Sequence, residues 1–314
     1  MKSIFLIALA VFLLSCSKIT KSPKVKLAIN PWPGYEFLYL ASEKGFFLQE
    51  GLNVELIEAP SLADVQRMYA QGHANAMATT MIEAVTSAGE LKKPTSLVLI
   101  PDYSNGGDVI LSNENITSVR ELKGKRVGAE IGSLGMFVLV KALKKNGLSL
   151  ADVEVINVEQ LNALNAININ EIEAIVTYPP YSIELLNKTN SLKIFTSAEI
   201  PNDVVDTISV DSSILKQDPS WLKKFHKVWE RSLNYAKTNQ QDAYEIMAQR
   251  EGISVKEFTE ALTGLYILPA SEQLKVLSSI QLKKNINEVC QTLMITKSIS
   301  FDCQILPRYL TMAQ

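Results

Sequence analysis

The chain has 314 residues and a formal net charge of −2, with 31 basic and 33 acidic side chains. No block of Lys or Arg stands out, which argues against nucleic acid as a partner. Its two histidines, His73 and His226, lie far apart in sequence and there is no CxxC motif, which argues against a metal site.

The first residues have the pattern of an export signal. Lys2 precedes an apolar run of about 11 residues, Ile4 to Leu14, which is too short to span a bilayer and fits a signal-peptide h-region. Cys16 then follows a small residue, as in the lipobox of bacterial lipoproteins, which this stretch resembles. We predict a signal peptide over residues 1–16, lipidation of Cys16 and a polar tether over residues 17–24. The alternative is an ordinary cleaved signal with an incidental cysteine.

Strands and helices alternate in the next part of the chain. Ser61 is expected to cap a helix, with Asp64 three residues on. This βαβα rhythm predicts a mostly parallel sheet with helices on its faces. The predicted strands are Val25–Asn30, Asn53–Glu58, Ala76–Thr79 and Ser96–Pro101, and the predicted helices are Tyr35–Phe47, Ser61–Gln71 and Thr80–Ala88.

The same rhythm restarts after Tyr103–Gly107, a polar segment whose two glycines can absorb changes in backbone dihedral angle, as a hinge requires. The predicted strands of this second unit are Asp108–Ser112, Lys125–Ala129, Val153–Val158, Ala174–Thr177 and Leu192–Phe195. Its predicted helices are Ser118–Leu122, Leu134–Asn146, Leu161–Asn168 and Tyr181–Leu186.

A further apolar strand, Val204–Val210, is followed by helices alone. These helices are Trp221–Thr238, Asp242–Arg250, Ser254–Leu265, Ser271–Leu277 and Lys283–Met294. We predict an α/β fold with two lobes, two mostly parallel sheets and a helical C-terminal tail. Lobe 1 comprises residues 25–104 and 208–314, and lobe 2 comprises residues 105–207. Cys290 and Cys303 either form a disulfide, which export permits, or remain two separate buried thiols.

Candidate ligand-binding residues follow the predicted strands, because ligands of open parallel sheets bind beyond the carboxyl ends of the strands. Pro31 and Pro33 stiffen the first of these turns, so its two aromatic rings reach a bound solute at little entropic cost. The alternative for Trp32 is that it plugs the core. The candidates are Trp32, Tyr35, Thr79, Thr80, Glu83, Asn105, Asp108, Ser133, Leu134, Tyr178, Tyr181 and Asp206.

Four further candidates have a competing structural interpretation. Ser133 opens a helix whose free amides favour an anionic or polar ligand group, or it is a plain N-cap. Asp108 either binds a ligand amine or caps hinge amides. Glu83 lies one turn into its helix and can instead be a surface residue that complements the helix dipole. Asp206, inside an apolar strand, is expected to pair with Lys or Arg.

Enzyme motifs are missing from the sequence. Gly128–Gly135 is glycine-rich, but its spacing is neither GxGxxG nor that of a phosphate loop, which excludes a nucleotide site. No GxSxG, HExxH or Ser/His/Asp set is present. We therefore expect no enzymatic activity, no cofactor and no metal.

Four segments resemble the solute-binding proteins of ABC importers in the nitrate/sulfonate/taurine group, which includes an NMT1-like domain. Their order and spacing carry the resemblance, and it implies a periplasmic-binding-protein fold of type II that closes on its ligand like a hinged trap. It also implies ligand contacts from Trp32–Tyr35, Thr79–Thr80, Asn105–Asp108, Ser133–Leu134 and Tyr178–Tyr181. The segments are PWPGYEFLYLASEKGFFLQEGLNVEL, DYSNGGDVIL, LKGKRVGAEIGSLGMFVLVKALKKNGLSLADVEVINV and AIVTYPPYS.

The resemblance implies a lipid-anchored, monomeric binding protein that faces the periplasm or cell exterior and delivers a small organic solute to an ABC permease. The expected solute is sulfonate- or taurine-like, zwitterionic or of pyrimidine type. The candidate ligand-binding residues include several carboxylates and no evident Arg, which disfavours a small inorganic anion such as nitrate as the solute. One alternative is a pyrimidine-biosynthesis enzyme with this domain, which would use histidine chemistry and iron. The other is a ligand-binding receptor for a membrane sensor.

Overall fold

The computed structural model describes residues 22–313. The predicted signal peptide and Cys16 lie outside these residues. β1 (Lys24–Ile29) begins at Lys24, which was assigned to the tether. No helix in the described range is both long and apolar enough to cross a membrane.

The first sheet has six strands in the order β13-β4-β11-β3-β1-β2. β1, β2 and β3 are parallel, and β13 is parallel to β4. β11 is antiparallel to both β3 and β4 and lies between them, so the chain returns to this sheet after building the second one. The strands after β1 are β2 (Asn53–Glu58), β3 (Ala76–Thr80), β4 (Thr95–Leu99), β11 (Asp206–Asp211) and β13 (Leu310–Met312).

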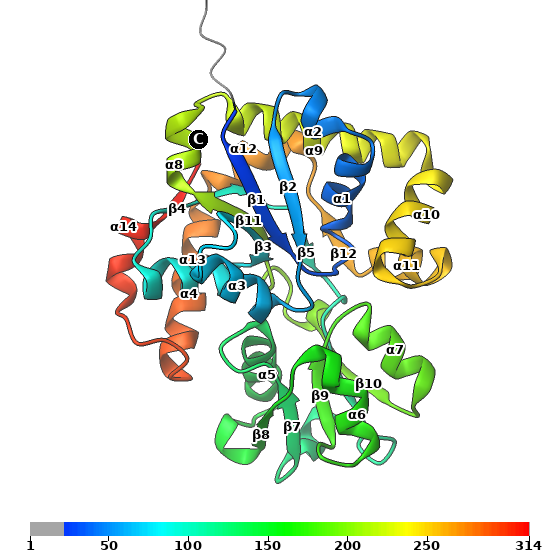
Figure 1. Cartoon of the computed structure of the whole chain (residues 1–314). Coiled ribbons are helices and arrows are strands. Elements are labelled where there is room, and N and C mark those ends of the chain that lie inside the picture. Colours follow the sequence, from blue (N-terminus) through cyan, green and yellow to red (C-terminus); the bar gives the residue numbers. More distant parts are fainter. Residues whose placement is uncertain (1–21, 314) are drawn as a thin grey trace, which may run out of the picture.

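Helices cover this sheet. α3 and α4 pack on its strands with α13 and α14 behind α4, while α1 packs on α9. We call this assembly the upper body, after its place in Figure 1. Its helices are α1 (Glu36–Glu43), α2 (Phe46–Gln49), α3 (Leu62–Ala70), α4 (Met81–Leu91), α8 (Ser212–Gln217), α9 (Trp221–Thr238), α10 (Gln240–Glu251), α11 (Val255–Leu262), α12 (Gln273–Leu277), α13 (Ile280–Ile295) and α14 (Leu306–Tyr309).

The second sheet has five strands in the order β10-β6-β9-β7-β8, and with its helices it forms the lower body (Figure 1). β7 is parallel to β8 and β9, whereas β6 is antiparallel to β9 and β10. The elements are β6 (Val109–Ser112), β7 (Arg126–Ala129), β8 (Glu154–Asn157), β9 (Ala174–Thr177), β10 (Leu192–Thr196), α5 (Leu134–Lys145), α6 (Ala163–Asn168) and α7 (Tyr181–Lys188).

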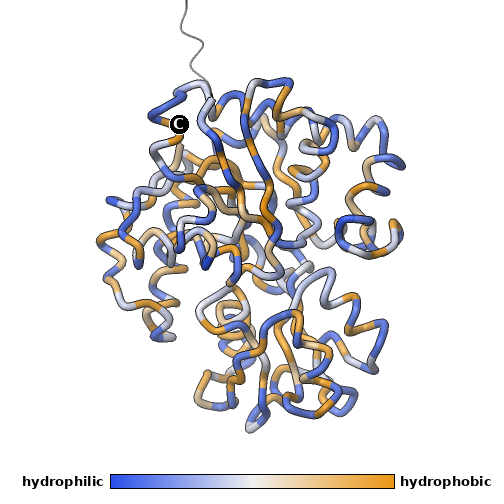
Figure 2. Tube along the Cα trace, in the orientation of Figure 1, coloured by the Kyte–Doolittle hydropathy of each residue, from blue (hydrophilic) through white to orange (hydrophobic). Residues whose placement is uncertain are grey.

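The α/β fold with mostly parallel sheets, expected from the sequence, is confirmed. The predicted boundaries of the lobes stay a prediction. Hydrophobic residues follow the strands, and hydrophilic residues gather at the outer loops (Figure 2). β3 and β4 are buried along their whole length, as expected for central strands covered on both faces.

Three short strands were not predicted. β5 (Asp102–Ser104) overlaps the start of the predicted hinge Tyr103–Gly107 and pairs antiparallel with β12 (Leu265–Ile267). The third is β13, at the edge of the first sheet. Each has three residues, too few for an alternating pattern to be recognised.

Six 3-10 helices connect the regular elements of the described range. They are η1 (Val119–Leu122), η2 (Leu150–Asp152), η3 (Gln160–Asn162), η4 (Ser197–Glu199), η5 (Ala270–Glu272) and η6 (Cys303–Ile305). A disulfide joins Cys290 of α13 to Cys303 of η6, with the Cα atoms 5.9 Å apart, so the structure contains the bridge rather than two separate thiols.

Candidate ligand-binding site

The turn that follows β1 is held in place by a buried carboxylate. The Nε1 of Trp32 donates to both oxygens of Asp102, each at 3.3 Å. A Cβ at Gly34 would lie 1.9 Å from Asp102 Oδ2, so only glycine lets this carboxylate approach the turn. A Cβ at Gly107 would likewise lie 2.7 Å from the Trp32 ring. The turn and the hinge segment are therefore packed directly against each other.

Asp206, the first residue of β11, has a tyrosine as its partner. The hydroxyl of Tyr35 donates to Asp206 Oδ1, and the carboxyl of Asp206 also shares a hydrogen bond with that of Asp102. The prediction that Asp206 pairs with Lys or Arg is wrong. In the register of the sheet Asp206 lies opposite Thr80, which places it at the carboxyl end of β3.

Two buried side-chain oxygens near this turn lack a hydrogen-bond partner in the described part of the chain. They are Oδ2 of Asp108, which precedes β6, and Oδ1 of Asn30, which follows β1. The backbone N–H of Asp108 donates to Ser104 Oγ at 3.1 Å, and Asn30 Nδ2 donates to the carbonyl of Pro31 at 3.0 Å. A buried acceptor without a donor is unfavourable, and a ligand N–H would satisfy it.

Glu83 connects the two bodies. Its Oε2 accepts from the backbone N–H of Thr80 at 3.1 Å and from Thr80 Oγ1 at 2.5 Å, within the upper body. Its Oε1 accepts from Ser133 Oγ at 2.7 Å and from the backbone N–H of Leu134 at 2.9 Å, at the start of α5. Glu83 is fully buried, so the surface interpretation is wrong. The hydroxyl of Ser133 makes no N-capping bond and donates to Glu83 instead.

A small cavity of about 10 Å³ lies between the two bodies, with room for about one water molecule. Seven of the candidate residues line it: Trp32, Tyr35, Thr80, Asp108, Leu134, Tyr178 and Asp206. The sequence analysis missed two other lining residues, Asn30 and Leu62. Asn30 resembled the last residue of a strand, and Leu62 an ordinary core residue of a helix.

Aromatic rings form one wall of this cavity. The ring of Trp32 meets that of Tyr178 edge-on, with centroids 6.0 Å apart, and Tyr178 meets Tyr181 in the same way at 5.8 Å. The hydroxyl of Tyr178 is buried with no partner among the described residues. The hydroxyl of Tyr181 donates to the carbonyl of Pro60 at 2.5 Å and so joins the lower body to the upper.

Five candidates do not line the cavity, and ligand contact by them stays a prediction. Glu83, Ser133 and Tyr181 make the contacts between the bodies described above. Thr79 is buried one position before Thr80 in β3 and therefore faces the other side of the sheet. Asn105 is exposed, and its N–H donates to the carbonyl of Gly264 at 2.8 Å.

The site is acidic and has no basic partner. None of the ion pairs within residues 22–313 involves Glu83, Asp102, Asp108 or Asp206. Burial raises the pKa of Asp102 and of Asp108 to about 7. Burial also raises the pKa of Glu83, and burial together with the charge of Asp102 raises that of Asp206.

The histidines are not part of this cavity. Nε2 of His226 lies 2.6 Å from the carbonyl of Val98, and His73 is exposed. Across residues 22–313, no group of three or more His, Cys, Asp or Glu side chains is arranged to hold a metal ion.

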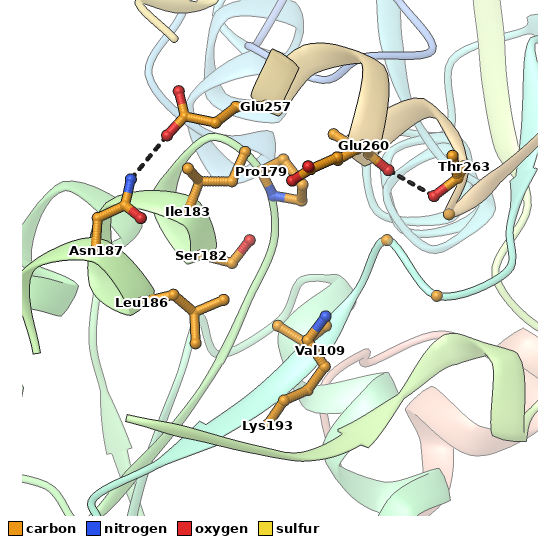
Figure 3. Close-up of a pocket in the computed structure, with 14 residues that line it drawn as sticks. Val109, Pro179, Ser182, Ile183, Leu186, Asn187, Lys193, Glu257, Glu260 and Thr263 are labelled. Atoms are coloured by element: carbon orange, nitrogen blue, oxygen red, sulfur yellow. Dashed lines mark hydrogen bonds between the residues drawn. The ribbon is translucent and has the colours of Figure 1, made fainter. Parts of the chain in front are cut away.

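A second cavity, of about 270 Å³, lies between α7 of the lower body and α11 of the upper body (Figure 3). Asn187 Nδ2 donates to Glu257 Oε1 at 2.8 Å across it. The hinge glycines Gly106 and Gly107 also line it. This cavity thus marks a further place where the two bodies meet.

Three comparisons with known proteins bear on this site. A family model described as NMT1/THI5 like matches residues 32–243. The chain is 25% identical over 232 residues to a 4-amino-5-hydroxymethyl-2-methylpyrimidine phosphate synthase of Aspergillus parasiticus, covering 68% of this chain and 66%, just under two thirds, of that relative.

Two solved structures share the fold at low identity. The periplasmic aliphatic sulphonate-binding protein SsuA of Escherichia coli has a TM-score of 0.76 and 15% identity, with 92% of this chain and 98% of that chain covered. The periplasmic nitrate-binding protein NrtA of Synechocystis has a TM-score of 0.73 and 12% identity, with 91% and 86% covered.

Proposed function

The chain belongs to the NMT1/THI5-like family, and from this premise we propose that it is the solute-binding protein of an ABC importer. It captures a small organic solute between two lobes, which correspond to the upper and lower bodies, and catalyses no reaction. Monomeric and held by a lipidated Cys16 at the membrane, it faces the periplasm or the cell exterior and delivers the solute to a membrane permease.

The observation that carries the proposal is a cavity lined from both bodies by unsatisfied polar groups. Asn30, Asp108 and Tyr178 line this cavity, and each has a buried polar atom without a hydrogen-bond partner in residues 22–313. Apolar side chains with a few convergent polar groups are typical of small-molecule sites. The fold shared with SsuA and NrtA, named as sulphonate- and nitrate-binding proteins, supports the same conclusion.

Hinge closure explains how a solute larger than water reaches this place. The cavity measures about 10 Å³, whereas sites for organic ligands measure on the order of 300 Å³ or more. Several contacts that cross between the bodies are polar, such as the hydrogen bonds of Tyr181 with Pro60 and of Asn187 with Glu257. The buried hydrogen bonds of Glu83 to the start of α5 also cross between the bodies. Such contacts can break and reform, so the bodies can separate to admit the solute and close on it.

A thermal-shift screen of small metabolites tests the proposal. We expect one compound class to raise the melting temperature, because a ligand that binds only the folded protein stabilises it. Trp32→Ala should remove most of that shift, since it deletes the aromatic wall. Tyr266→Ala is the matched control, because this side chain is 52% exposed on β12 and does not line the cavity. Absence of any shift across a broad panel would contradict a binding role.

An enzyme is the second candidate, favoured by the name of the Aspergillus relative, a pyrimidine phosphate synthase. Incubation of the purified protein with iron and pyridoxal phosphate, followed by product analysis, separates the two. A pyrimidine product would establish the enzyme, and ligand binding without turnover would establish the binding protein. Neither His73 nor His226 lines the cavity, which supports the second outcome.

A further inference from the structure

The N-terminus of α5 is already occupied by a carboxyl group that belongs to the protein. A helix of 12 residues presents free amides and a positive dipole end, which attract a negative group. Glu83 Oε1 accepts from the amide of Leu134 at 2.9 Å and from Ser133 Oγ at 2.7 Å. The carboxylate of Glu83 therefore takes the position that a ligand sulfonate or carboxylate would need at this helix end.

The remaining polar lining of the cavity consists mainly of hydrogen-bond acceptors. Asn30 and Asp108 are each 1% exposed, and each has one oxygen without a partner in the described chain. Asp206 is 2% exposed and shares a hydrogen bond with Asp102, which a ligand N–H can replace once the proton leaves. The hydroxyl of Tyr178, also without a partner there, can accept as well as donate. A carboxylate or amide oxygen needs a donor, and a charged donor forms the stronger bond. An anionic ligand would add another acceptor among these oxygens.

We propose that the cleft binds a small organic cation whose N–H groups donate to Asp108, Asp206 and Asn30. The proposal rests on the binding function above and narrows it to one charge class. The rings of Trp32 and Tyr178 attract a cation by their π-electrons, and the apolar walls from Leu62 and Leu134 exclude water around it.

Protons should leave the site when the cation binds. Asp102, which receives the Trp32 N–H beside the cavity, and Asp108 have pKa values raised to about 7 by burial, so both carry a proton part of the time at neutral pH. The other titratable groups around them are Tyr35 on the turn, Glu83 on α4, Tyr178 after β9, Asp206 on β11 and Glu130 after β7. All of them are acids, so a bound cation favours the ionised form of each.

Titration calorimetry of the full chain tests this inference with four cations and two anions. The cations are methylguanidinium, benzamidinium, 4-aminopyridinium and tetramethylammonium, and the anions are ethanesulfonate and nitrate. We expect one or more of the three cations with N–H groups to bind, and tetramethylammonium and both anions to fail. Measured in buffers of different ionisation enthalpy, binding should release protons, and affinity should rise between pH 6 and pH 8.

Two nearly isosteric variants test which carboxylates bind the cation. Asp108→Asn and Asp206→Asn should each weaken the cation about tenfold or more, because each replaces a charged acceptor by a neutral amide. Asp302→Asn is the control, since Asp302 is exposed at the start of η6 and does not line the cavity. Melting curves of the variants establish that they fold.

The outcomes separate this inference from the proposed function. Binding of ethanesulfonate or nitrate that is lost in Trp32→Ala would overturn the cation and leave the binding function intact. Binding by none of the three N–H cations would also overturn it. The binding function itself fails only if the wider metabolite panel gives no shift in melting temperature.

Discussion

At the scale of single residues, the main feature of the candidate site is a group of four buried carboxylates. Glu83, Asp102, Asp108 and Asp206 are at most 2% exposed and form no ion pair within residues 22–313. Burying an unpaired charge is costly, so such a group binds a proton or a cation. Asp102 and Asp206 affect each other directly, because each perturbs the pKa of the other.

The stability of the ligand-free protein should therefore fall as the pH rises through 7. A carboxyl whose folded pKa is raised binds more protons in the folded state than in the unfolded state. Its stabilising contribution is complete below the unfolded pKa, near 4, and is lost as the pH passes the folded pKa of about 7 for Asp108. Each proton difference corresponds to about 1.4 kcal/mol per pH unit.

Denaturant unfolding between pH 6 and pH 8.5 measures this slope. Asp108→Asn should reduce it and make the protein more stable at pH 8.5 by on the order of 1 kcal/mol, because the amide does not ionise. Asp302→Asn should leave the slope unchanged. An identical slope in wild type and Asp108→Asn would show that Asp108 does not titrate in this range.

The sequence could predict residues that stand out from their surroundings. Trp32 and Tyr35 on a turn, and Asp206 in an apolar strand, are conspicuous and line the cavity. Asn30 could not be recognised, because an amide at a strand end is common. Asp102 lies between the predicted strand Ser96–Pro101 and the predicted hinge, and its approach to Gly34 depends on packing that no local pattern encodes.

At the scale of elements, the contact between α4 and α5 is the most specific link between the bodies. Glu83 caps α4 through Thr80 and binds the start of α5 with the same carboxylate. Predicting this link required knowing that two helices about 50 residues apart in sequence face each other. Thr80 and Glu83 have the spacing of a capping box, but that spacing does not reveal the second helix.

Glu83→Gln should weaken closure. The amide keeps the shape but cannot accept all four hydrogen bonds, so we expect the free energy of unfolding to fall by about 1–3 kcal/mol. Glu121→Gln is the matched control, because the exposed Glu121 makes a capping box on η1 without contacting the other body. Equal losses from the two variants, measured by denaturant unfolding, would show that the link to α5 adds nothing.

Helix boundaries show the same limits of local patterns. The single helix predicted over Tyr35–Phe47 is divided into α1 and α2, because Gly45 adopts a left-handed conformation with φ of 69° and ends α1. The long amphipathic α9 matches its predicted range, since its apolar stripe is unambiguous.

At the scale of the whole molecule, two chain crossings connect the bodies. β5 leads through Asn105–Gly107 into β6, and the segment after β10 returns through Val205 into β11. The two crossings touch where Tyr103 bridges to Val205 and where Ser104 Oγ lies 2.7 Å from Ser197 Oγ. The alternation of strands and helices predicted two units and a return strand, because that alternation is itself a whole-chain pattern.

The central claim is that the two bodies close on a ligand held between them. The distance between the bodies can be measured with spin labels on cysteines introduced at two exposed positions. These are Leu48 of α2 and Leu161 of η3, which are 81% and 64% exposed. With Cys16→Ser and the Cys290–Cys303 bridge intact, no other thiol takes up label. Double electron–electron resonance should show a broad distribution of longer distances without ligand. With a saturating bound cation it should show a single shorter distance. An unchanged distance distribution with a compound that binds by calorimetry would contradict closure around the ligand.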